Sequence, residues 1–412
     1  MRYSLQNKDI PLIDFRIDMQ TENINGIASR KTTYSIEKIH SEHTNIFPKD
    51  IEEYTGEAIQ RWIDNRKAPK NRQFINKILS VFEDAKNPIT FLDITHALSL
   101  NDTYWVNCME TPMTWDDCSL YTHKFSEILA YVAFTGYSSR KVHGVISSPE
   151  FTTGGAQKKC WSNRENGIFL VKGASPLYDA PERQGRTDVV AEYCASQIAS
   201  EMNFSHVDYD IEQFTHYDGS RELVSVCRLF TSEDEGYLPF HVYAARQGLP
   251  THHSALSDYA TELKYAELYG KEAFEDMMLF DSLILNTDRH MTNFGMMFGT
   301  DTGEILHPAP LFDHGMSLLV GAAKSDLKTP EDYASTLESH FGLSFDEQAY
   351  RFVQSRHIPQ LREMRGFYFK RHPLISFAEE YLSNLERYIH SRAAHIIKLY
   401  QKKKQRSSSF QR

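Results

Sequence analysis

The stretch from Leu283 to Leu318 constrains this chain most, because it sets acidic and amide side chains at a fixed spacing between turn-forming residues. Asp288 lies in the run N-T-D-R-H-M-T-N, and Asn293 follows it by five positions. Asp313 follows Asn293 by twenty positions, in the run F-D-H-G. Carboxylate and amide oxygens are the ligands that Mg²⁺ prefers. The spacing therefore predicts a loop that orients a reacting group beside a metal ion.

Composition predicts an ordinary globular protein. The 412 residues suffice for two to three domains, with 41% hydrophobic and 24% charged residues. The net charge of −10 argues against direct nucleic-acid binding, which needs a basic face. No run approaches the eighteen apolar residues of a membrane span. Five widely spaced cysteines, no C-x-x-C and no recognisable signal peptide favour a cytoplasmic location.

The chain divides by pattern into four parts. Residues 1–138 are expected to be mainly helical and of unknown role, although residues 10–36 hold two alternating runs typical of a small β element. Residues 139–232 predict a small lobe with an antiparallel sheet, and residues 233–400 a helical lobe. Residues 401–412 are basic and serine-rich, which predicts a disordered tail.

The small lobe is predicted from a sequence of short runs. Val142–Ser147 and Gly167–Lys172 are strand-like, and the helical pattern Arg186–Met202 follows. Two more strand-like runs are Val207–Phe214 and Glu222–Phe230. The expected fold class is therefore α+β, with a small antiparallel-sheet lobe, a mostly helical lobe and a helical N-terminal region.

A glycine turn precedes the predicted strand Gly167–Lys172. Gly154 and Gly155 would let backbone N–H groups approach phosphate oxygens, and Lys158 or Lys159 adds positive charge. A hairpin turn with no ligand is the alternative reading of these glycines. The residues expected to contact a nucleotide here are Thr152, Thr153, Gly154, Gly155, Ala156, Gln157 and Lys159.

Lys172 ends a predicted strand in the run G-I-F-L-V-K, where its ammonium group would contact phosphates. Glu192 lies on the following helix and is its expected partner. Each residue alone is more often a solvated surface charge. The pair is a candidate for phosphate binding because it lies in the chain between the glycine turn and the loop at Asp288.

The loop supplies the remaining parts of phosphoryl transfer. Asp288 would accept or orient the proton of a substrate hydroxyl, whereas Asn293 and Asp313 would hold Mg²⁺. Arg289 and His290 would support the loop, with His290 near the nucleotide. A capped turn at Asp288 and an ordinary turn residue at Asp313 are the alternatives.

These residues resemble the HipA family of bacterial serine/threonine kinases, in order and spacing over about residues 145–400. The resemblance is carried by G-A-Q-K-K (Gly155–Lys159), F-L-V-K (Phe169–Lys172), A-E-Y-C (Ala191–Cys194), N-T-D-R-H-M-T-N-F (Asn286–Phe294) and L-F-D-H-G-M-S (Leu311–Ser317).

The resemblance implies a bilobal protein-kinase-like fold and an ATP- and Mg²⁺-dependent serine/threonine kinase with Asp288 as catalytic base. It also implies a hinge facing adenine, formed by Cys227, Arg228, Leu229 and Phe230. The family's autophosphorylated serine, just before the glycine turn, is replaced here by Thr152, with Thr153 beside it.

The substrate and partners stay open at this point. The resemblance implies a protein substrate and, through the toxin-antitoxin systems of the family, an antitoxin-like partner. The family's N-terminal β subdomain is not recognisable in the sequence of residues 1–135, so that partnership does not transfer directly. A small-molecule or lipid kinase, and a kinase-shaped binding module without catalysis, are the competing hypotheses, because a fold does not fix its function.

Overall fold

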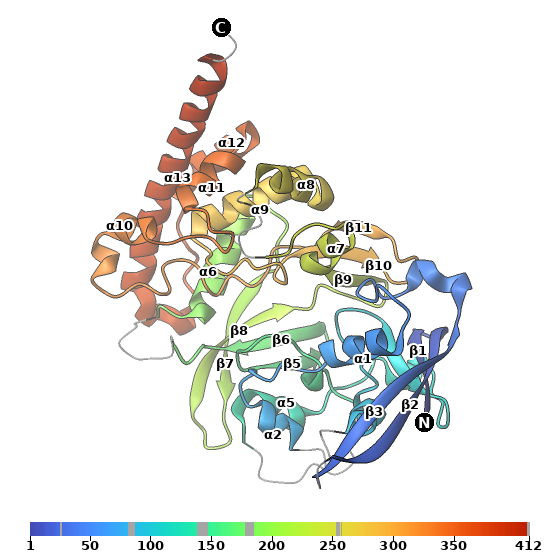
Figure 1. The fold of residues 1–412 in the computed structure, drawn as a ribbon. Helices are drawn as coiled ribbons and strands as arrows, with labels where there is room; N and C mark the ends of the chain where they lie inside the picture. Colours follow the sequence, from blue (N-terminus) through green and yellow to red (C-terminus); the bar gives the residue numbers. More distant parts are fainter. Residues whose placement is uncertain are drawn as a thin grey trace. The chain divides into compact units, whose positions relative to one another are not determined.

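The computed structural model describes residues 1–24, 27–80, 87–137, 147–177, 185–252, 256 and 258–409 (Figure 1). The chain forms two compact units. Unit 1 consists of Met1–Leu170, Thr231–Leu238 and Met297–His307, and unit 2 consists of Val171–Phe230, Pro239–Met296 and Pro308–Arg412. The division at residue 170 differs from the boundary expected at residue 138.

Unit 1 begins with a sheet. Strands β1 (Arg2–Asn7), β2 (Ile10–Ile24), β3 (Ile27–Ile39) and β4 (Tyr104–Cys108) lie in the order β3-β2-β1-β4, and adjacent strands pair antiparallel (Figure 1). The β element expected within residues 10–36 is confirmed as part of this sheet.

The expectation that residues 1–138 are mainly helical is wrong. Side chains on one face of β1 and β2, including Tyr3, Leu5, Ile13 and Phe15, are almost completely buried, because the alternating pattern places them on the core side. The helices of the region are α1 (Gly56–Asn65), α2 (Ile75–Leu79), α3 (Pro88–Thr95), α4 (Trp115–Cys118) and α5 (Glu127–Thr135), with 3₁₀ turns η1 (Ser41–Ile46) and η2 (Pro149–Phe151).

Two further sheets complete the β structure. Strands β9 (Glu235–Pro239), β10 (Gly295–Gly299) and β11 (Ile305–Pro308) have the order β11-β10-β9. The other sheet has the order β5-β6-β8-β7, and the division between the units falls inside β6. Its strands are β5 (Lys159–Arg164), β6 (Gly167–Gly173), β7 (Tyr209–Thr215) and β8 (Arg221–Arg228), and helix α6 (Asp188–Glu201) precedes β7 in the chain.

The strand, helix, strand, strand pattern that the sequence predicts over 167–230 is therefore confirmed. The expected run Val142–Ser147 lies, except for Ser147, outside the described residues.

Helices dominate unit 2, and α9 (Lys271–Ile284) is at its centre. Ten of its fourteen residues are buried, and it packs against α8, α11 and α13. The other helices are α7 (Phe240–Arg246), α8 (Tyr259–Tyr269), α10 (Pro330–Ser335), α11 (Phe345–Phe352), α12 (Ile358–Glu363) and α13 (Glu379–Ser409), with 3₁₀ turns η5 (Asp326–Lys328), η6 (Ser355–His357), η7 (Met364–Gly366) and η8 (Pro373–Ala378).

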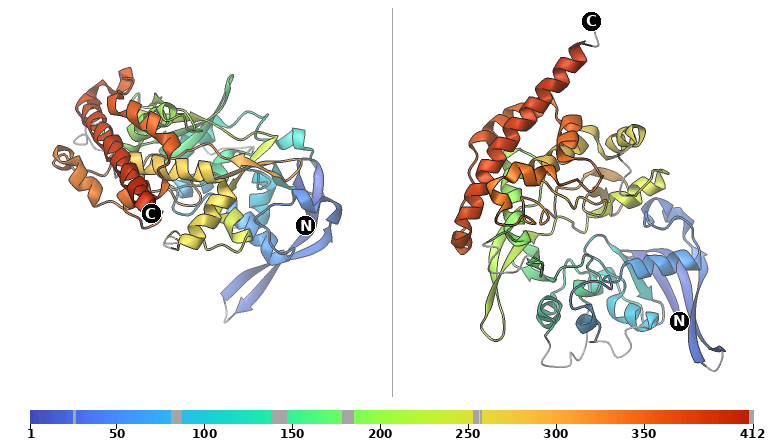
Figure 2. Two further views of the ribbon diagram at one scale, coloured as in Figure 1. Left: turned by 90° about the horizontal axis from the view of Figure 1, so that it is seen from above. Right: turned by 60° about the vertical axis from the view of Figure 1, so that its left-hand side comes forward.

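The disordered tail expected over residues 401–412 is not what the structure shows. Helix α13 continues to Ser409 as one long rod (Figure 2). Lysine, glutamine and arginine are good helix formers, so this basic run extends a helix that has already formed. Lys403 also anchors it, because its ammonium group donates to the carbonyl oxygens of Arg351 (2.7 Å) and Val353 (3.1 Å). Across the described ranges, no helix has both the length and the apolar composition that crossing a bilayer requires.

Replacing Gly56 by alanine should destabilise unit 1. A Cβ at this position would collide with the carbonyl group of Tyr34 on β3, where α1 begins. Such a backbone collision costs about 1–3 kcal/mol of unfolding free energy. Urea unfolding measures the loss, with Gly366→Ala as the matched control, since no atom lies within 4 Å of the corresponding Cβ there. Equal stabilities of the two variants would contradict this packing.

Candidate active site

The loop that carries Asp288 starts where α9 ends. Leu285 has a positive φ of 57°, so the chain leaves the helix there, and its N–H donates to the carbonyl oxygen of Asp281. Leucine rarely takes this conformation, which costs on the order of 1–3 kcal/mol and persists only where surrounding contacts enforce it. The tightly packed α9 and the polar network described next supply those contacts.

Arg289 holds the loop from inside. Its side chain is 1% exposed, and its Nε lies 3.0 Å from Oδ2 of Asp281, which is also buried. Nη1 donates to the carbonyl oxygens of Asn293 (2.9 Å) and Phe312 (2.6 Å), and Nη2 donates to Nδ1 of His314 (3.0 Å). One guanidinium therefore connects Asn293, at the end of the Asp288 loop, to Phe312 and His314, the two neighbours of Asp313. We call this set the Arg289 network.

Asn286 connects the Arg289 network to Asp288. Its Nδ2 donates to Oδ1 of Asp281 (3.0 Å), and its Oδ1 accepts from the N–H of Asp288 (3.1 Å). Asn293 closes the loop by donating from Nδ2 to the carbonyl oxygen of Asp288 (3.1 Å). The two ends of the N-T-D-R-H-M-T-N run are thereby fixed to one another.

The Asp288 carboxylate faces outward from this rigid base. Its side chain is 48% exposed, and Oδ2 lies 3.9 Å from Nε2 of His290. Partial burial raises the pKa of Asp288 above its ordinary value, and the charge of Asp313 raises it further, while His290 opposes the shift. A carboxylate with a raised pKa is a better proton acceptor than an ordinary surface aspartate.

Lys172 joins the predicted metal residue. Its Nζ donates to Oδ1 of Asp313 (2.7 Å) and to the carboxylate of Glu192, which in turn accepts from the hydroxyl of Ser225. Burial alone would lower the pKa of Lys172, but the carboxylates of Asp313 and Glu192 outweigh it and hold that pKa well above the ordinary value. The lysine is thus a permanent cation, and its pairing with Glu192, predicted from sequence, is present in the structure.

Asp313 stands in a strained backbone conformation with a φ of 58°. Its N–H donates to the hydroxyl of Tyr209 (3.0 Å), and the preceding residue is held through the Arg289 contact to Phe312. The neighbouring His314 is fully buried, and burial lowers its pKa well below the ordinary value, with Arg289 adding to the effect. A neutral imidazole is required here because its Nδ1 accepts from Arg289.

Backbone hydrogen bonds join the Asp288 loop to the Asp313 segment. The N–H of Thr287 donates to the carbonyl oxygen of Met316 (3.1 Å), and the N–H of Leu318 donates to that of Ile284 (2.7 Å). Residues 284–287 and 316–318 are therefore locked side by side. Asp288, Asn293, Asp313, Lys172 and Glu192 all belong to unit 2.

The donor set suits Mg²⁺. Asn293 uses Nδ2 in its bond to Asp288, which directs Oδ1 away from that bond. The Asp313 side chain is 38% exposed and offers carboxylate oxygens. Mg²⁺ is usually held by one or two such groups together with phosphates and water rather than by a closed protein cage.

The glycine turn belongs to unit 1 and is held by a buried arginine. Nη1 of Arg72 donates to the carbonyl oxygens of Glu150 (2.7 Å) and Thr153 (3.3 Å), and Nη2 donates to that of Lys159 (3.0 Å). Nη2 also forms an ion pair with Oε2 of Glu150 at 2.9 Å. The N–H of Gln73 further donates to the carbonyl oxygen of Ala156 (2.8 Å).

The structure distinguishes the two lysines of the turn. Nζ of Lys159 donates to the carbonyl oxygen of Gly154 (3.0 Å), whereas Nζ of Lys158 lies 5.5 Å from the ring centre of Phe134. Gly155 has a φ of 82°, and a Cβ there would collide with the Lys159 ammonium group, so the turn needs glycine. Lys159 is therefore the cation at the turn, and Gly154, Gly155 and Ala156 are exposed.

The hinge residues lie at the end of β8. Cys227 and Arg228 are its last two residues, and Leu229 and Phe230 follow it. The ring of Phe230 lies 5.2 Å from that of Phe312, which directly precedes Asp313. The end of β8 therefore reaches the run Leu311–Ser317 within unit 2. We call this run the metal segment, after the predicted role of Asp313.

Several supporting residues were missed from sequence. Asp281 and His314 belong to the Arg289 network, and Arg72 and Glu150 hold the glycine turn. A single acid inside the apolar run of α9 was the available signal for Asp281. Arg72 gave no comparable signal, because its partners lie about eighty positions away in the chain.

Replacing Arg289 by methionine should destabilise unit 2 by about 3–5 kcal/mol, because Asp281 would stay buried without its counter-charge. Urea unfolding measures this loss. Lys324→Met is the control, since its pair with Glu380 is exposed and worth at most about 1 kcal/mol. The double variant Asp281→Leu with Arg289→Met should recover most of the loss. A loss in Arg289→Met no greater than in the control would contradict the network.

Comparison with known proteins shows likeness in structure alone. Neither a protein-family model nor a curated protein matches the sequence. Among solved structures, the proinflammatory kinase CtkA of Helicobacter pylori matches with 18% identity and a TM-score of 0.40, over 60% of this chain and 96% of that chain.

HipA of Shewanella oneidensis MR-1, solved in a toxin-antitoxin complex with HipB and operator DNA, is similar over nearly the whole length. It matches with 11% identity and a TM-score of 0.51, over 96% of this chain and 99% of that chain. At this identity the likeness is one of fold. The expected α+β, kinase-like fold is therefore confirmed, and it resembles that of HipA.

Proposed function

We propose that the protein is an ATP- and Mg²⁺-dependent protein serine/threonine kinase. The observation that carries the proposal is the meeting of Lys172 and Asp313, with Nζ and Oδ1 2.7 Å apart, beside a loop that the Arg289 network holds rigid. A cation for phosphates, oxygen ligands for a metal and an exposed carboxylate are the parts that phosphoryl transfer needs. The HipA-like fold supports the same reading.

In this proposal Asp288 acts on the acceptor. Its carboxylate accepts the proton of a substrate hydroxyl as that oxygen bonds to the γ-phosphorus, while the bond from γ-phosphorus to the bridging oxygen breaks and ADP leaves. The raised pKa of Asp288 favours proton acceptance. The Asn293 side chain holds the Asp288 backbone in place during this step.

In the proposal, the other groups of the site offset the negative charge of the phosphates. Lys172 contacts the α- and β-phosphates, and Glu192 fixes the direction of its ammonium group. Asn293 Oδ1 and the Asp313 carboxylate hold Mg²⁺, which when bound neutralises charge on the phosphates. By the resemblance to HipA, residues 227–230 would face the adenine, and the glycine turn stays a separate prediction for phosphate contact.

Thr152 is the better candidate for autophosphorylation. The hydroxyl of Thr153 donates to the carbonyl oxygen of Pro149 (2.6 Å) and accepts from the indole N–H of Trp161 (2.8 Å). The hydroxyl of Thr152 makes one longer bond of 3.4 Å, also to Pro149. Moving Thr152 into reach of a phosphate therefore breaks fewer contacts. An antitoxin-like partner stays a prediction from resemblance, and the complex of Shewanella HipA with HipB is the reason to look for one.

Replacing Asp288 by asparagine should lower phosphoryl transfer by roughly 10²–10⁴-fold, because the proton acceptor is lost while the shape is kept. Transfer of radiolabelled γ-phosphate to protein measures the rate, and mass spectrometry locates the sites. Asp208→Asn is the matched control, since that side chain is 96% exposed. Full activity in Asp288→Asn would remove this loop from the mechanism. Transfer to a sugar or lipid and to no protein would change the acceptor class.

Replacing Asp313 by alanine should abolish the Mg²⁺-dependent part of nucleotide binding. Saturating ATP at about 100 times its Kd adds about 2.7 kcal/mol of stability, which a thermal shift detects. The wild type and Asp288→Asn should both show a larger shift with Mg²⁺ than without it, whereas Asp313→Ala should not. A Mg²⁺-dependent shift that survives in Asp313→Ala contradicts the metal assignment. No shift in any variant would favour a binding module without catalysis.

A further inference from the structure

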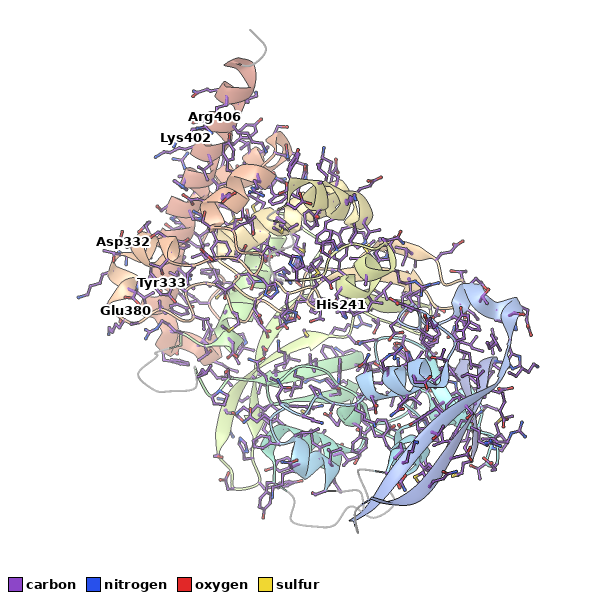
Figure 3. The ribbon with its side chains drawn as sticks, in the orientation of Figure 1. His241, Asp332, Tyr333, Glu380, Lys402 and Arg406 are labelled. Carbon is purple, nitrogen blue, oxygen red and sulfur yellow. The ribbon has the colours of Figure 1, made fainter. Side chains whose placement is uncertain are left out.

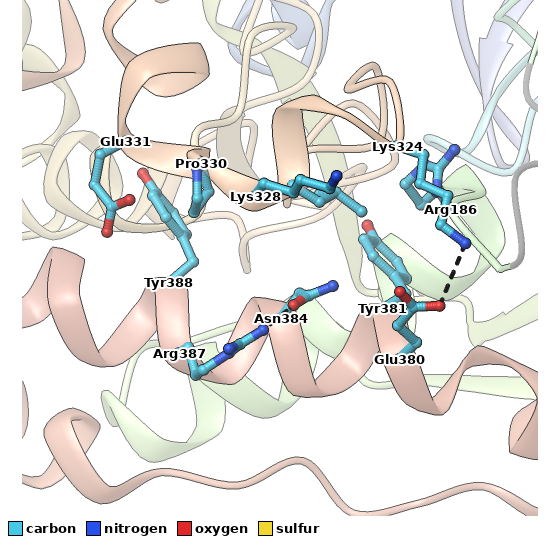
Figure 4. A pocket seen from close by; sticks show the side chains of 11 residues that line it. Arg186, Lys324, Lys328, Pro330, Glu331, Glu380, Tyr381, Asn384, Arg387 and Tyr388 are labelled. Carbon is cyan, nitrogen blue, oxygen red and sulfur yellow. Dashed lines mark hydrogen bonds and ion pairs between the residues drawn. The ribbon is translucent and has the colours of Figure 1, made fainter.

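Unit 2 contains a cavity that the proposed reaction does not use. It has a volume of about 480 Å³ and lies between Arg186, two residues before α6, the segment 324–331 and the first half of α13 (Figure 4). None of the candidate active-site residues lines it. Its size is within the range typical of small-molecule sites, about 300–1,000 Å³.

The charged lining of the cavity is mainly positive. Four cationic and two acidic side chains line it, which leaves a surplus of two positive charges in a chain whose net charge is −10. Lys324 and Glu380 form a 3.6 Å pair, but both are well exposed, so this pair neutralises little. The charged residues are Arg186, Lys324, Lys328, Arg387, Glu331 and Glu380.

Two side chains of the cavity wall, Arg186 and Tyr381, are held in place by the surrounding chain. Arg186 is 5% exposed, and the preceding Gly185 has a φ of 88°, where a Cβ would collide with Ala378. The chain therefore packs closely against the start of α13, which fixes the base of the Arg186 side chain. Tyr381 is equally fixed, because its hydroxyl donates to the carbonyl oxygen of Leu318 (2.6 Å).

Tyr388 adds a donor to this lining. It rises from α13 toward Pro330 on the opposite wall (Figure 4). Its hydroxyl is buried, and within the described residues it has no hydrogen-bond partner. Burial raises the pKa of Tyr388, so the hydroxyl keeps its proton and remains a donor. A buried donor without an acceptor is uncommon, and an oxygen of water or of a ligand is one way to satisfy it.

We propose that this cavity binds a small phosphomonoester. Such a group carries about 1.5–2 negative charges at neutral pH and would be attracted to the mainly positive lining. Arginine and lysine are the side chains that recognise phosphate, and the tyrosine hydroxyl adds a donor. Leu327, Pro330 and the rings of Tyr381 and Tyr388 offer apolar surface to the rest of the ligand. The proposal does not depend on kinase activity.

The cavity wall is also connected to the Asp313 segment. Leu318, which accepts from Tyr381, has a φ of 52°, and its N–H donates to the carbonyl oxygen of Ile284 (2.7 Å) at the end of α9. Asp188, two residues after Arg186, lies 3.0 Å through its Cβ from the position a Cβ would take at Gly315. Both walls therefore touch residues that follow Asp313 closely, and a ligand that steadies Tyr381 steadies Leu318.

Isothermal titration calorimetry with phenyl phosphate tests the site, with benzoate and phenol as controls for charge and ring. Wild type should bind phenyl phosphate more tightly than either control compound. The double variant Lys328→Gln with Arg387→Gln, both exposed side chains, should bind at least about tenfold more weakly, as expected for two lost phosphate contacts. Lys402→Gln, on the same helix beyond the cavity (Figure 3), is the matched control and should bind as wild type does.

Two results would overturn the proposal: no binding of phenyl phosphate by the wild type, or the same affinity in the double variant as in the wild type. If the double variant binds as the wild type does while Lys172→Met loses binding, the probe occupies the active site instead. A thermal melt of the double variant shows that it is folded. Hydrogen exchange tests the connection to Leu318. Its amide should exchange more slowly with phenyl phosphate bound, and unchanged exchange would contradict that connection.

Discussion

The buried guanidinium of Arg289 is the interaction on which the candidate active site depends. It neutralises Asp281 and donates to Asn293, Phe312 and His314. Removing a cation from water costs several kcal/mol, which is offset only when every donor finds a partner, as here. A single side chain thereby sets the spacing between the loop and the metal segment. The partly exposed carboxylates of Asp288 and Asp313 are then positioned by one shared network.

Lys172, on strand β6, connects the sheet to the same site. It lies between the carboxylates of Glu192 and Asp313, so β6, α6 and the metal segment share one charge cluster. The positive φ values at Leu285 and Asp313 mark where the backbone is strained around it. Such strain costs on the order of 1–3 kcal/mol per residue and is retained where the contacts around it over-determine the conformation. Pre-organisation of this kind is what phosphoryl transfer requires of a protein.

The sequence predicted the short-range part of this arrangement well. Asp288, Asn293 and Asp313 lie in runs whose spacing is itself the signal, and Lys172 with Glu192 follows from a strand and the next helix. The residues that hold the glycine turn did not follow, because Arg72 reaches its contacts only through the folded chain. The N-terminal sheet was underestimated for a different reason. Strands β1, β2 and β3 pair with their neighbours in the chain, but β-propensity depends on packing context and is a weaker signal than helix propensity. The roles of the site residues stay predictions.

The proposed function requires that Asn293 and Asp313 hold one metal ion beside Asp288. Crystals grown with Mn²⁺ in place of Mg²⁺ and a non-hydrolysable ATP analogue test it directly through anomalous diffraction. We expect a manganese peak about 2.0–2.3 Å from Oδ1 of Asn293 and from a carboxylate oxygen of Asp313. A peak at another place, or none with the analogue bound, would contradict it.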